Sequence, residues 1–124
     1  MRIFNRAKSK NIYTATFDTT RMRSPSEIRR VIEARLRSYL SRDRTGIRRE
    51  VLRLFVKKKS ITIAELVTEL QKRFTVTYHA IASMVGIIAS RIGILRAMRT
   101  AEGVNSYELK EKYVDIVTGI VRTV

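Results

Sequence analysis

The sequence predicts a mainly α-helical protein with a small β-hairpin. Apolar residues recur in five segments at the spacing that places them on one face of a helix. Residues suited to helix N-termini precede several of these segments. Two short strand-like runs, residues 94–99 and 104–109, flank a loop that contains Gly103. With 124 residues, of which 44% are hydrophobic, the chain is long enough for one domain with a packed core.

The sequence pattern of residues 60–93 predicts a short strand followed by two helices. Thr62 stands three positions before Glu65, a spacing at which each side chain caps the backbone N–H of the other. The first helix is expected to run to Phe74 and to end in the tight turn 75–77. Thr77 is expected to cap a second helix, which Gly93 closes in a left-handed conformation. The inward stripe of the second helix is expected to hold Ile81, Met84, Val85, Ile88 and Ile92.

Two further helical segments precede this region and one follows it. Ser24, Pro25 and Glu27 form a helix start for residues 25–40, and Thr45 is a candidate cap for a helix that ends at residues 57–59. Residues 110–122 carry a broad apolar stripe. We therefore expect a basic N-terminal arm over residues 1–23 and a single domain over residues 24–124. That domain has a core at 46–109 and flanking helices at 25–40 and 110–122.

The charge of the chain indicates a polyanionic partner. Lys and Arg number 26 against 11 Asp and Glu, which leaves a net charge of +15. A protein this basic attracts nucleic acid almost regardless of its fold. The excess is uneven, because the first 59 residues hold 18 of these cations and only 5 of the acids.

Several classes of function find no support in the sequence. His79 is the single histidine and cysteine is absent, so a metal site would depend on carboxylates, which are scattered. No phosphate-binding glycine loop or nucleophile turn is present. We expect no enzyme activity, no cofactor and no small-molecule site. No apolar run reaches the length of a membrane span, and the N-terminus lacks a secretory signal, so the expected location is the cytoplasm.

Candidate base-contacting residues lie on the helix predicted after Thr77. Tyr78, His79, Ser83 and Arg91 turn away from its apolar stripe, and the first turns of such a helix usually approach base edges. In the alternative interpretation, Tyr78 and Gly86 only pack this helix against its neighbours. Arg96 and Arg99 of the hairpin are candidates for phosphate contacts or for simple solvated charges.

Arginines of the two N-terminal helices are the second group of candidates. We expect them to face outward and to add affinity for a polyanion, because acids are too few to pair with all of them. The alternative is a solvated basic face. These candidates are Arg29, Arg30, Arg37, Arg48, Arg49 and Arg53.

Residues 46–109 resemble a winged helix-turn-helix domain, with 63–74 and 78–92 as the paired helices and 94–109 as the wing. The whole chain is similar to an uncharacterised family of small archaeal proteins with a winged-helix core. The resemblance implies duplex DNA binding, often in transcriptional control.

Two other functions remain open from the sequence. The arginine-rich N-terminal half would suit an RNA or ribonucleoprotein component, and a winged helix also serves as a protein-interaction adaptor. The apolar stripes of helices 25–40 and 110–122 either pack on each other or build a homodimer, and the homodimer is the favoured expectation.

Overall fold

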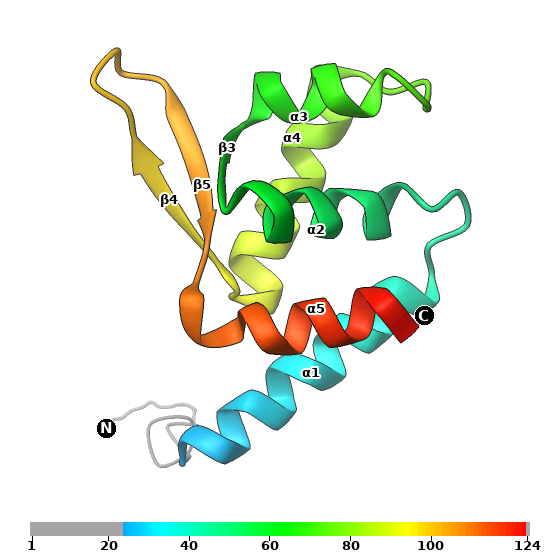
Figure 1. Cartoon of the computed structure of the whole chain (residues 1–124), viewed down its shortest axis with the longest axis vertical. Helices are drawn as coiled ribbons and strands as arrows, with labels where there is room; N and C mark the ends of the chain where they lie inside the picture. Colours follow the sequence, from blue (N-terminus) through cyan, green and yellow to red (C-terminus); the bar gives the residue numbers. More distant parts are fainter. Residues whose placement is uncertain (1–23, 124) are drawn as a thin grey trace, which may run out of the picture. The chain divides into compact units, whose positions relative to one another are not determined.

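The computed structural model describes residues 24–123 and shows a mainly helical chain with a small antiparallel sheet, which confirms the coarse prediction (Figure 1). The predicted arm, residues 1–23, lies outside the described residues. In chain order the elements are α1 Pro25–Ser41, α2 Ile47–Lys58, β3 Ser60–Thr62, α3 Ile63–Leu70, α4 Tyr78–Ile87, the π-turn η2 Ile88–Ile92, β4 Leu95–Arg99, β5 Asn105–Leu109, the 3-10 turn η3 Glu111–Tyr113 and α5 Val114–Thr123.

The chain divides between Val31 and Ile32, within α1, into two compact units. The described part of the smaller unit is residues 24–31, which form the start of α1. There the backbone N–H of Ser24 donates to Oε1 of Glu27 over 2.8 Å, and the N–H of Glu27 donates back to Oγ of Ser24 over 3.2 Å. This reciprocal cap is the predicted helix start.

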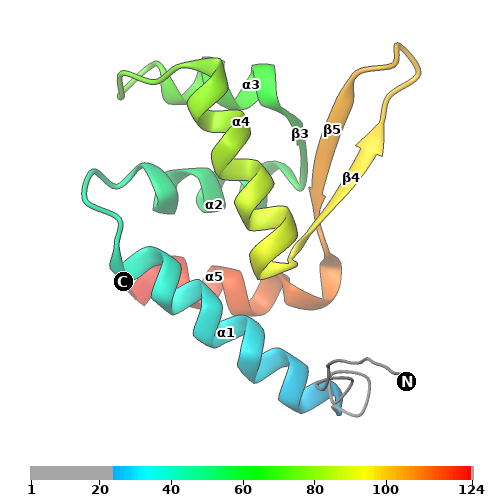
Figure 2. The ribbon, with the colours of Figure 1, turned by 180° about the vertical axis from the view of Figure 1, so that it is seen from behind.

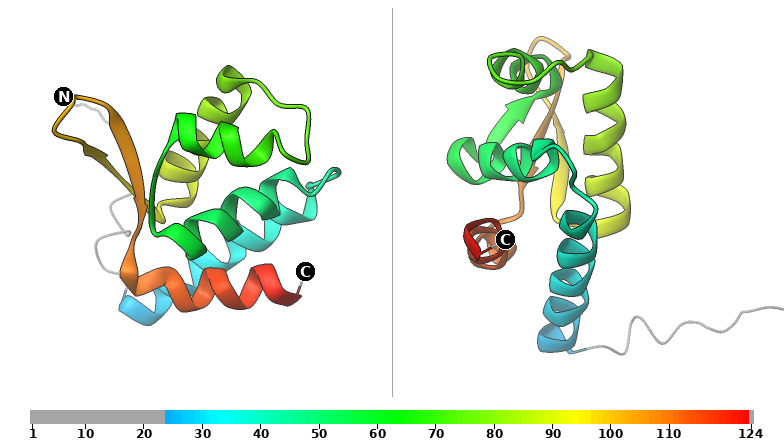
Figure 3. Two further views of the ribbon diagram at one scale, coloured as in Figure 1. Left: turned by 45° about the horizontal axis from the view of Figure 1, so that its top comes forward. Right: turned by 90° about the vertical axis from the view of Figure 1, so that its right-hand side faces the viewer.

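The larger unit, residues 32–124, buries its core around α2. This helix packs against α3, α5 and strand β5, and α3 packs in turn on α4. Helices α4 and α5 lie on different sides of α2 (Figure 3). The fully buried side chains come from every layer and include Leu36, Val51, Leu52, Phe55, Leu66, Ile81, Val85 and Val117. Because Val117, Ile120 and Val121 of α5 are buried within the chain, the stripe of this helix gives no argument for a dimer.

The hairpin joins β3 in a three-stranded sheet of order β3-β5-β4. Register places Ile61 opposite Tyr107 and Leu95 opposite Leu109. The N–H of Leu109 also donates to the carbonyl of Lys59 over 3.0 Å, which fixes the sheet to the end of α2. The strands begin one residue later than the sequence indicated, at Leu95 and Asn105.

The caps of α3 and α4 and the left-handed Gly93 confirm the sequence prediction, whereas the predicted end of α3 is wrong. Thr62 and Glu65 form the complete reciprocal cap, and Oγ1 of Thr77 accepts the N–H of Ala80. Helix α3 ends at Leu70 instead of Phe74, because residues 71–74 form turns. The predicted helix 78–92 becomes α4 and then a wider π-turn, in which the N–H of Gly93 donates to the carbonyl of Ile88.

The start of α2 depends on Asp43, which the sequence prediction overlooked. One carboxylate oxygen accepts the N–H groups of Gly46 and Arg48 and the other accepts that of Arg49, each over 3.1 Å. Thr45, the predicted cap, accepts only the N–H of Ile47 at 3.3 Å, and the N-cap residue is Gly46. The negative carboxylate thus satisfies three donors at the positive end of the helix.

We expect Asp43→Ala to lower the free energy of unfolding by about 1–2 kcal/mol, as the loss of a helix cap does. Urea denaturation followed by circular dichroism measures the change. Thr45→Ala is the matched control and should cost much less. Equal losses for the two variants would contradict the assignment of Asp43 as the principal cap.

Lys59 joins α2 to β3 with φ 66° and ψ −49°, a conformation that L-residues rarely adopt. Glycine adopts positive φ without steric cost. Lys59→Gly should therefore raise the free energy of unfolding by about 1 kcal/mol, as relief of local strain allows. Lys57→Gly, inside α2, should instead lower it by about 0.5–1 kcal/mol. Chemical denaturation of both variants measures the two changes in the free energy of unfolding, which should have opposite signs. A decrease for Lys59→Gly would contradict the proposed backbone strain.

Candidate nucleic-acid interface

Helix α4 presents one face that no other element of the larger unit covers. Seen from behind, the helix lies in the foreground (Figure 2). Ile81 and Val85 turn inward and are buried. The exposed residues of α4 and η2 are Tyr78, His79, Ala80, Ser83, Gly86, Ile87, Ser90 and Arg91. The four predicted base-contacting residues, Tyr78, His79, Ser83 and Arg91, are thus all at the surface of one helical segment.

The alternative that Tyr78 and Gly86 serve only to pack α4 is wrong. The side chain of Tyr78 is 58% exposed. A Cβ atom at Gly86 would meet nothing within 4 Å. Ile87 is also 41% exposed, although a large apolar side chain gains free energy from burial. The exposed face of α4 therefore carries uncharged and mostly small side chains along its middle, with the aromatic ring of Tyr78 at one end.

The turn before α4 is held by hydrogen bonds that orient the first residues of the helix. The amide of Gln71 donates to the carbonyl of Val76 over 3.3 Å. One residue later, the hydroxyl of Thr77 accepts the N–H of Ala80 over 3.1 Å. Tyr78 and His79 therefore leave a capped first turn and point to solvent.

The hairpin carries its two arginines in different arrangements. Arg96 of β4 lies 3.7 Å from the carboxylate of Glu108 on the neighbouring strand, and its side chain is 63% exposed. Nε of Arg99 donates to the carbonyl of Gly103 over 3.1 Å, which ties the side chain to the loop at the tip. Met98 and Val104 are exposed beside this tip. Arg96 and Arg99 are both exposed to solvent, but each already has a partner.

An open groove of about 390 Å³ lies between the second half of α1 and the end of α4. Arginines approach it from both sides, and no acidic residue lines it. Burial raises the pKa of Tyr39 to about 12, so its phenol is neutral at physiological pH. The principal lining residues are Arg35, Tyr39, Arg42, Ile87, Arg91 and Ile92.

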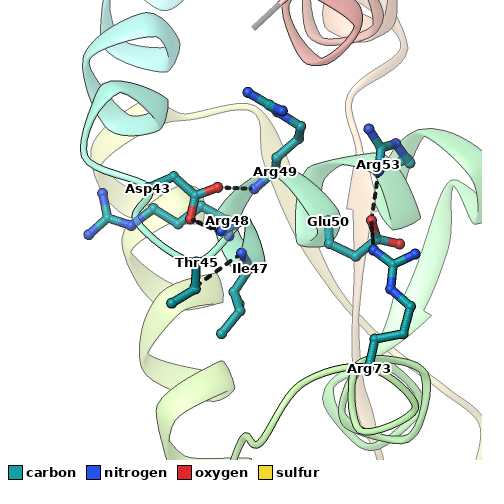
Figure 4. Close-up of polar contacts among 9 residues, drawn as sticks. Asp43, Thr45, Ile47, Arg48, Arg49, Glu50, Arg53 and Arg73 are labelled. Carbon is teal, nitrogen blue, oxygen red and sulfur yellow. Dashed lines mark hydrogen bonds and ion pairs between the residues drawn. The ribbon is translucent and has the colours of Figure 1, made fainter.

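The prediction that Arg48 and Arg49 face outward is wrong (Figure 4). The guanidinium of Arg48 lies 4.4 Å from the centre of the Tyr39 ring and donates to the Tyr39 carbonyl over 2.8 Å. Arg49 is half-buried, and its Nε has no hydrogen-bond partner among the described residues. Both side chains are partly buried because α2 is the central helix of the unit.

The remaining predicted arginines of the larger unit, Arg37 and Arg53, pair with carboxylates. Arg53 is exposed and lies 2.7 Å from Glu50, a carboxylate that Arg73 shares at 3.4 Å (Figure 4). Arg37 pairs with Glu33 at 2.9 Å, and these two residues line a separate depression together with α5. Arg29 and Arg30 belong to the smaller unit, on the first turns of α1.

Arg35 and Arg42 are the residues that the sequence prediction missed. They are exposed, and their side chains make no hydrogen bond or ion pair within residues 24–123. They stand seven residues apart with Ser38 and Tyr39 between them, which places all four on one face of a helix. This spacing could be read from the sequence. The sequence did not show that the end of α4 and η2 would lie opposite this face.

Metal-ligand clusters and membrane-spanning helices are absent from the part of the chain that the structure describes. Residues 24–123 contain no group of three or more His, Asp or Glu residues placed to hold a metal ion. No helix in this range combines the length and the apolar character that crossing a bilayer requires.

Comparison with known proteins places the chain in a family. The profile of the family described as "Protein of unknown function (DUF2551)" matches residues 36–117. The chain belongs to the DUF2551 family. An uncharacterized protein of the archaeon Archaeoglobus fulgidus is 40% identical over 91 residues, which are 73% of this chain and 92% of that protein. No solved structure shows significant similarity. The predicted similarity to an uncharacterised archaeal family is thereby confirmed.

Proposed function

We propose that this DUF2551 member is a winged helix-turn-helix protein that binds duplex DNA and acts in transcriptional control. Helices α3 and α4 are the paired helices of the motif, with α4 directed into the major groove. Strands β4 and β5 form the wing. The order β3, α3, α4, β4, β5 and the pairing of β3 with β5 support this assignment.

The observation that carries the proposal is the uncovered face of α4. A helix inside a domain normally loses its outer face to a neighbour or covers it with long charged side chains. Helix α4 does neither, because the exposed residues after its first two are Ala80, Ser83, Gly86 and Ile87, of which only Ile87 is large. Small side chains let the backbone of a helix come close to base edges, and a major groove is about 12 Å wide.

The proposed roles follow from the chemistry of each residue. Tyr78 and His79 stack on bases or hydrogen-bond to them, and Ser83 donates or accepts a hydrogen bond. Arg91 contacts a base or a neighbouring phosphate. Arg96 and Arg99 meet phosphates beside the wing, and the net charge of +15 adds affinity that does not depend on sequence.

An RNA or ribonucleoprotein role is the second candidate, because the chain concentrates its cations in residues 1–59. A homodimer is not part of the proposal. The dimer was suggested by the apolar stripes of α1 and α5. Within the larger unit these stripes are buried, at Ile32, Leu36 and Leu40 of α1 and at Val117, Ile120 and Val121 of α5.

Salt dependence of binding tests the proposed function. Fluorescence anisotropy with random-sequence duplex DNA should give an affinity that falls steeply and linearly on a log–log plot against salt concentration. Unlabelled structured RNA should compete less well than duplex DNA. Absence of duplex binding at low salt would refute the proposal. Stronger competition by RNA would favour the second candidate.

A further inference from the structure

The groove between α1 and α4 is the strongest feature that the base-contacting residues leave unexplained. Arg35 comes from α1, Arg42 comes from the turn directly after it, and Arg91 comes from the π-turn after α4. All three are exposed, and none makes a side-chain hydrogen bond or ion pair with the residues that the structure describes. Like charges brought together in this way repel one another, so the arrangement is favoured when an anion lies between them.

No acidic side chain lines the groove, so no carboxylate pairs with its arginines there. Both carboxylate oxygens of Asp43 accept backbone N–H groups at the start of α2. Glu33 pairs with Arg37 on the side of α1 that meets α5. The arginines of this region are therefore separated: Arg37 lies on the side of α5, whereas Arg35 and Arg42 lie on the side of α4 and η2.

The form of the groove suits an extended anion better than an enclosed small molecule. It is open to solvent, and Ile87 and Ile92 contribute an apolar part to its wall. The stretch of α1 from Arg35 to its last residue, Ser41, is about 9 Å long, and Arg42 follows directly. A phosphodiester strand carries repeated charges over such a distance, whereas a single phosphate would reach only one end.

The position of the groove relates it to the base-contacting face. Ile87 and Arg91 belong both to the exposed face of α4–η2 and to the lining of the groove. A duplex whose major groove holds the first turns of α4 has a sugar–phosphate strand at the rim of that groove, near the opposite end of the helix.

We propose that the groove formed by Arg35, Arg42 and Arg91 binds the sugar–phosphate backbone of the DNA strand that flanks the contacts of α4. This inference rests on the proposed function and assigns the phosphate contacts to the C-terminal part of α1, the turn after it and η2. It also accounts for the neutral middle of α4, because cations on the adjoining helix supply the affinity while α4 lies against the bases.

A triple variant with matched charge tests the inference on the full-length protein. Arg35→Gln, Arg42→Gln and Arg91→Gln are combined in one protein. Lys57→Gln, Lys58→Gln and Arg122→Gln are combined in the control, which loses the same charge at exposed positions outside the groove. Thermal unfolding by circular dichroism establishes that both variants fold.

Binding to random-sequence duplex DNA is then measured for each protein over a range of salt concentrations. Each lost phosphate contact lowers the slope of log affinity against log salt by about 0.9. The groove variant should therefore lose about 2–3 in slope and bind at least tenfold more weakly at low salt. The control should retain most of the slope.

The outcomes separate the inference from the proposed function. Equal slopes for the two triple variants, with the parent protein binding duplex DNA, would overturn the inference and leave the proposed function standing. No salt-dependent duplex binding by the parent would overturn both. If the groove variant loses affinity and slope only with structured RNA and not with duplex DNA, the groove binds RNA, and this result would also overturn the inference.

Discussion

Replacing Ser83 with glutamate should weaken binding to duplex DNA by about 100-fold or more, because a like charge placed in a polyanionic interface costs several kcal/mol. Ser83 is exposed on the second turn of α4, between two inward-facing residues, Ile81 and Val85. Its side chain can be enlarged without disturbing the core, so the variant should fold normally. Anisotropy titration with duplex DNA at low salt measures the loss.

Two controls separate local repulsion from other effects of Ser83→Glu. Ser83→Gln adds the same bulk without the charge and should retain considerably more affinity. Arg122→Gln changes the net charge of the protein by the same amount on α5, which lies on a different side of α2 from α4 (Figure 3). If Ser83→Glu binds no worse than Arg122→Gln, the face of α4 is not the DNA-binding surface.

Replacing Leu36 with alanine should lower the free energy of unfolding by about 2–5 kcal/mol, the usual cost of removing a large aliphatic side chain from a core. Leu36 lies on α1 and is 0% exposed. Such a loss is a large fraction of the stability of an ordinary domain. Urea denaturation followed by circular dichroism gives the change in free energy.

The neighbouring Arg37→Ala variant is the control for Leu36→Ala. Arg37 is exposed and forms a surface pair with Glu33, so its loss should cost about 0.5 kcal/mol or less. The contrast tests whether residues 32–41 belong to the same folded unit as α2–α5. Similar effects of the two substitutions would show that α1 is not part of that core.

The local structure of residues 60–93 could be predicted well because its signals lie within a few residues of one another. Thr62 and Glu65 cap each other directly, and Thr77 caps the next helix. Gly93 adopts the expected left-handed conformation with φ 87°. The candidates on α4 could be predicted for the same reason, since helical spacing alone separates inward from outward positions.

The α2 region was predicted less well, because two residues preceding the helix compete for its cap and one of its arginines packs on another helix. Asp43 caps α2 from three to six residues away, while the hydroxyl of the nearer Thr45 contacts a single N–H. Arg48 has the polarity of a surface residue, yet it lies against Tyr39 of another helix. No local pattern reveals which arginine of a basic helix will meet such a neighbour.

By itself, the sequence determined the approximate positions of the helices, the hairpin, the principal caps of α3 and α4, and the net charge of +15. These properties depend on short-range hydrogen bonds, on side-chain periodicity and on total charge. Only the tertiary structure decided that α5 covers α2, that α4 keeps an open face, and that Arg35, Arg42 and Arg91 share one groove. These arrangements depend on which apolar faces pack together, and that choice is made by contacts between residues far apart in the chain.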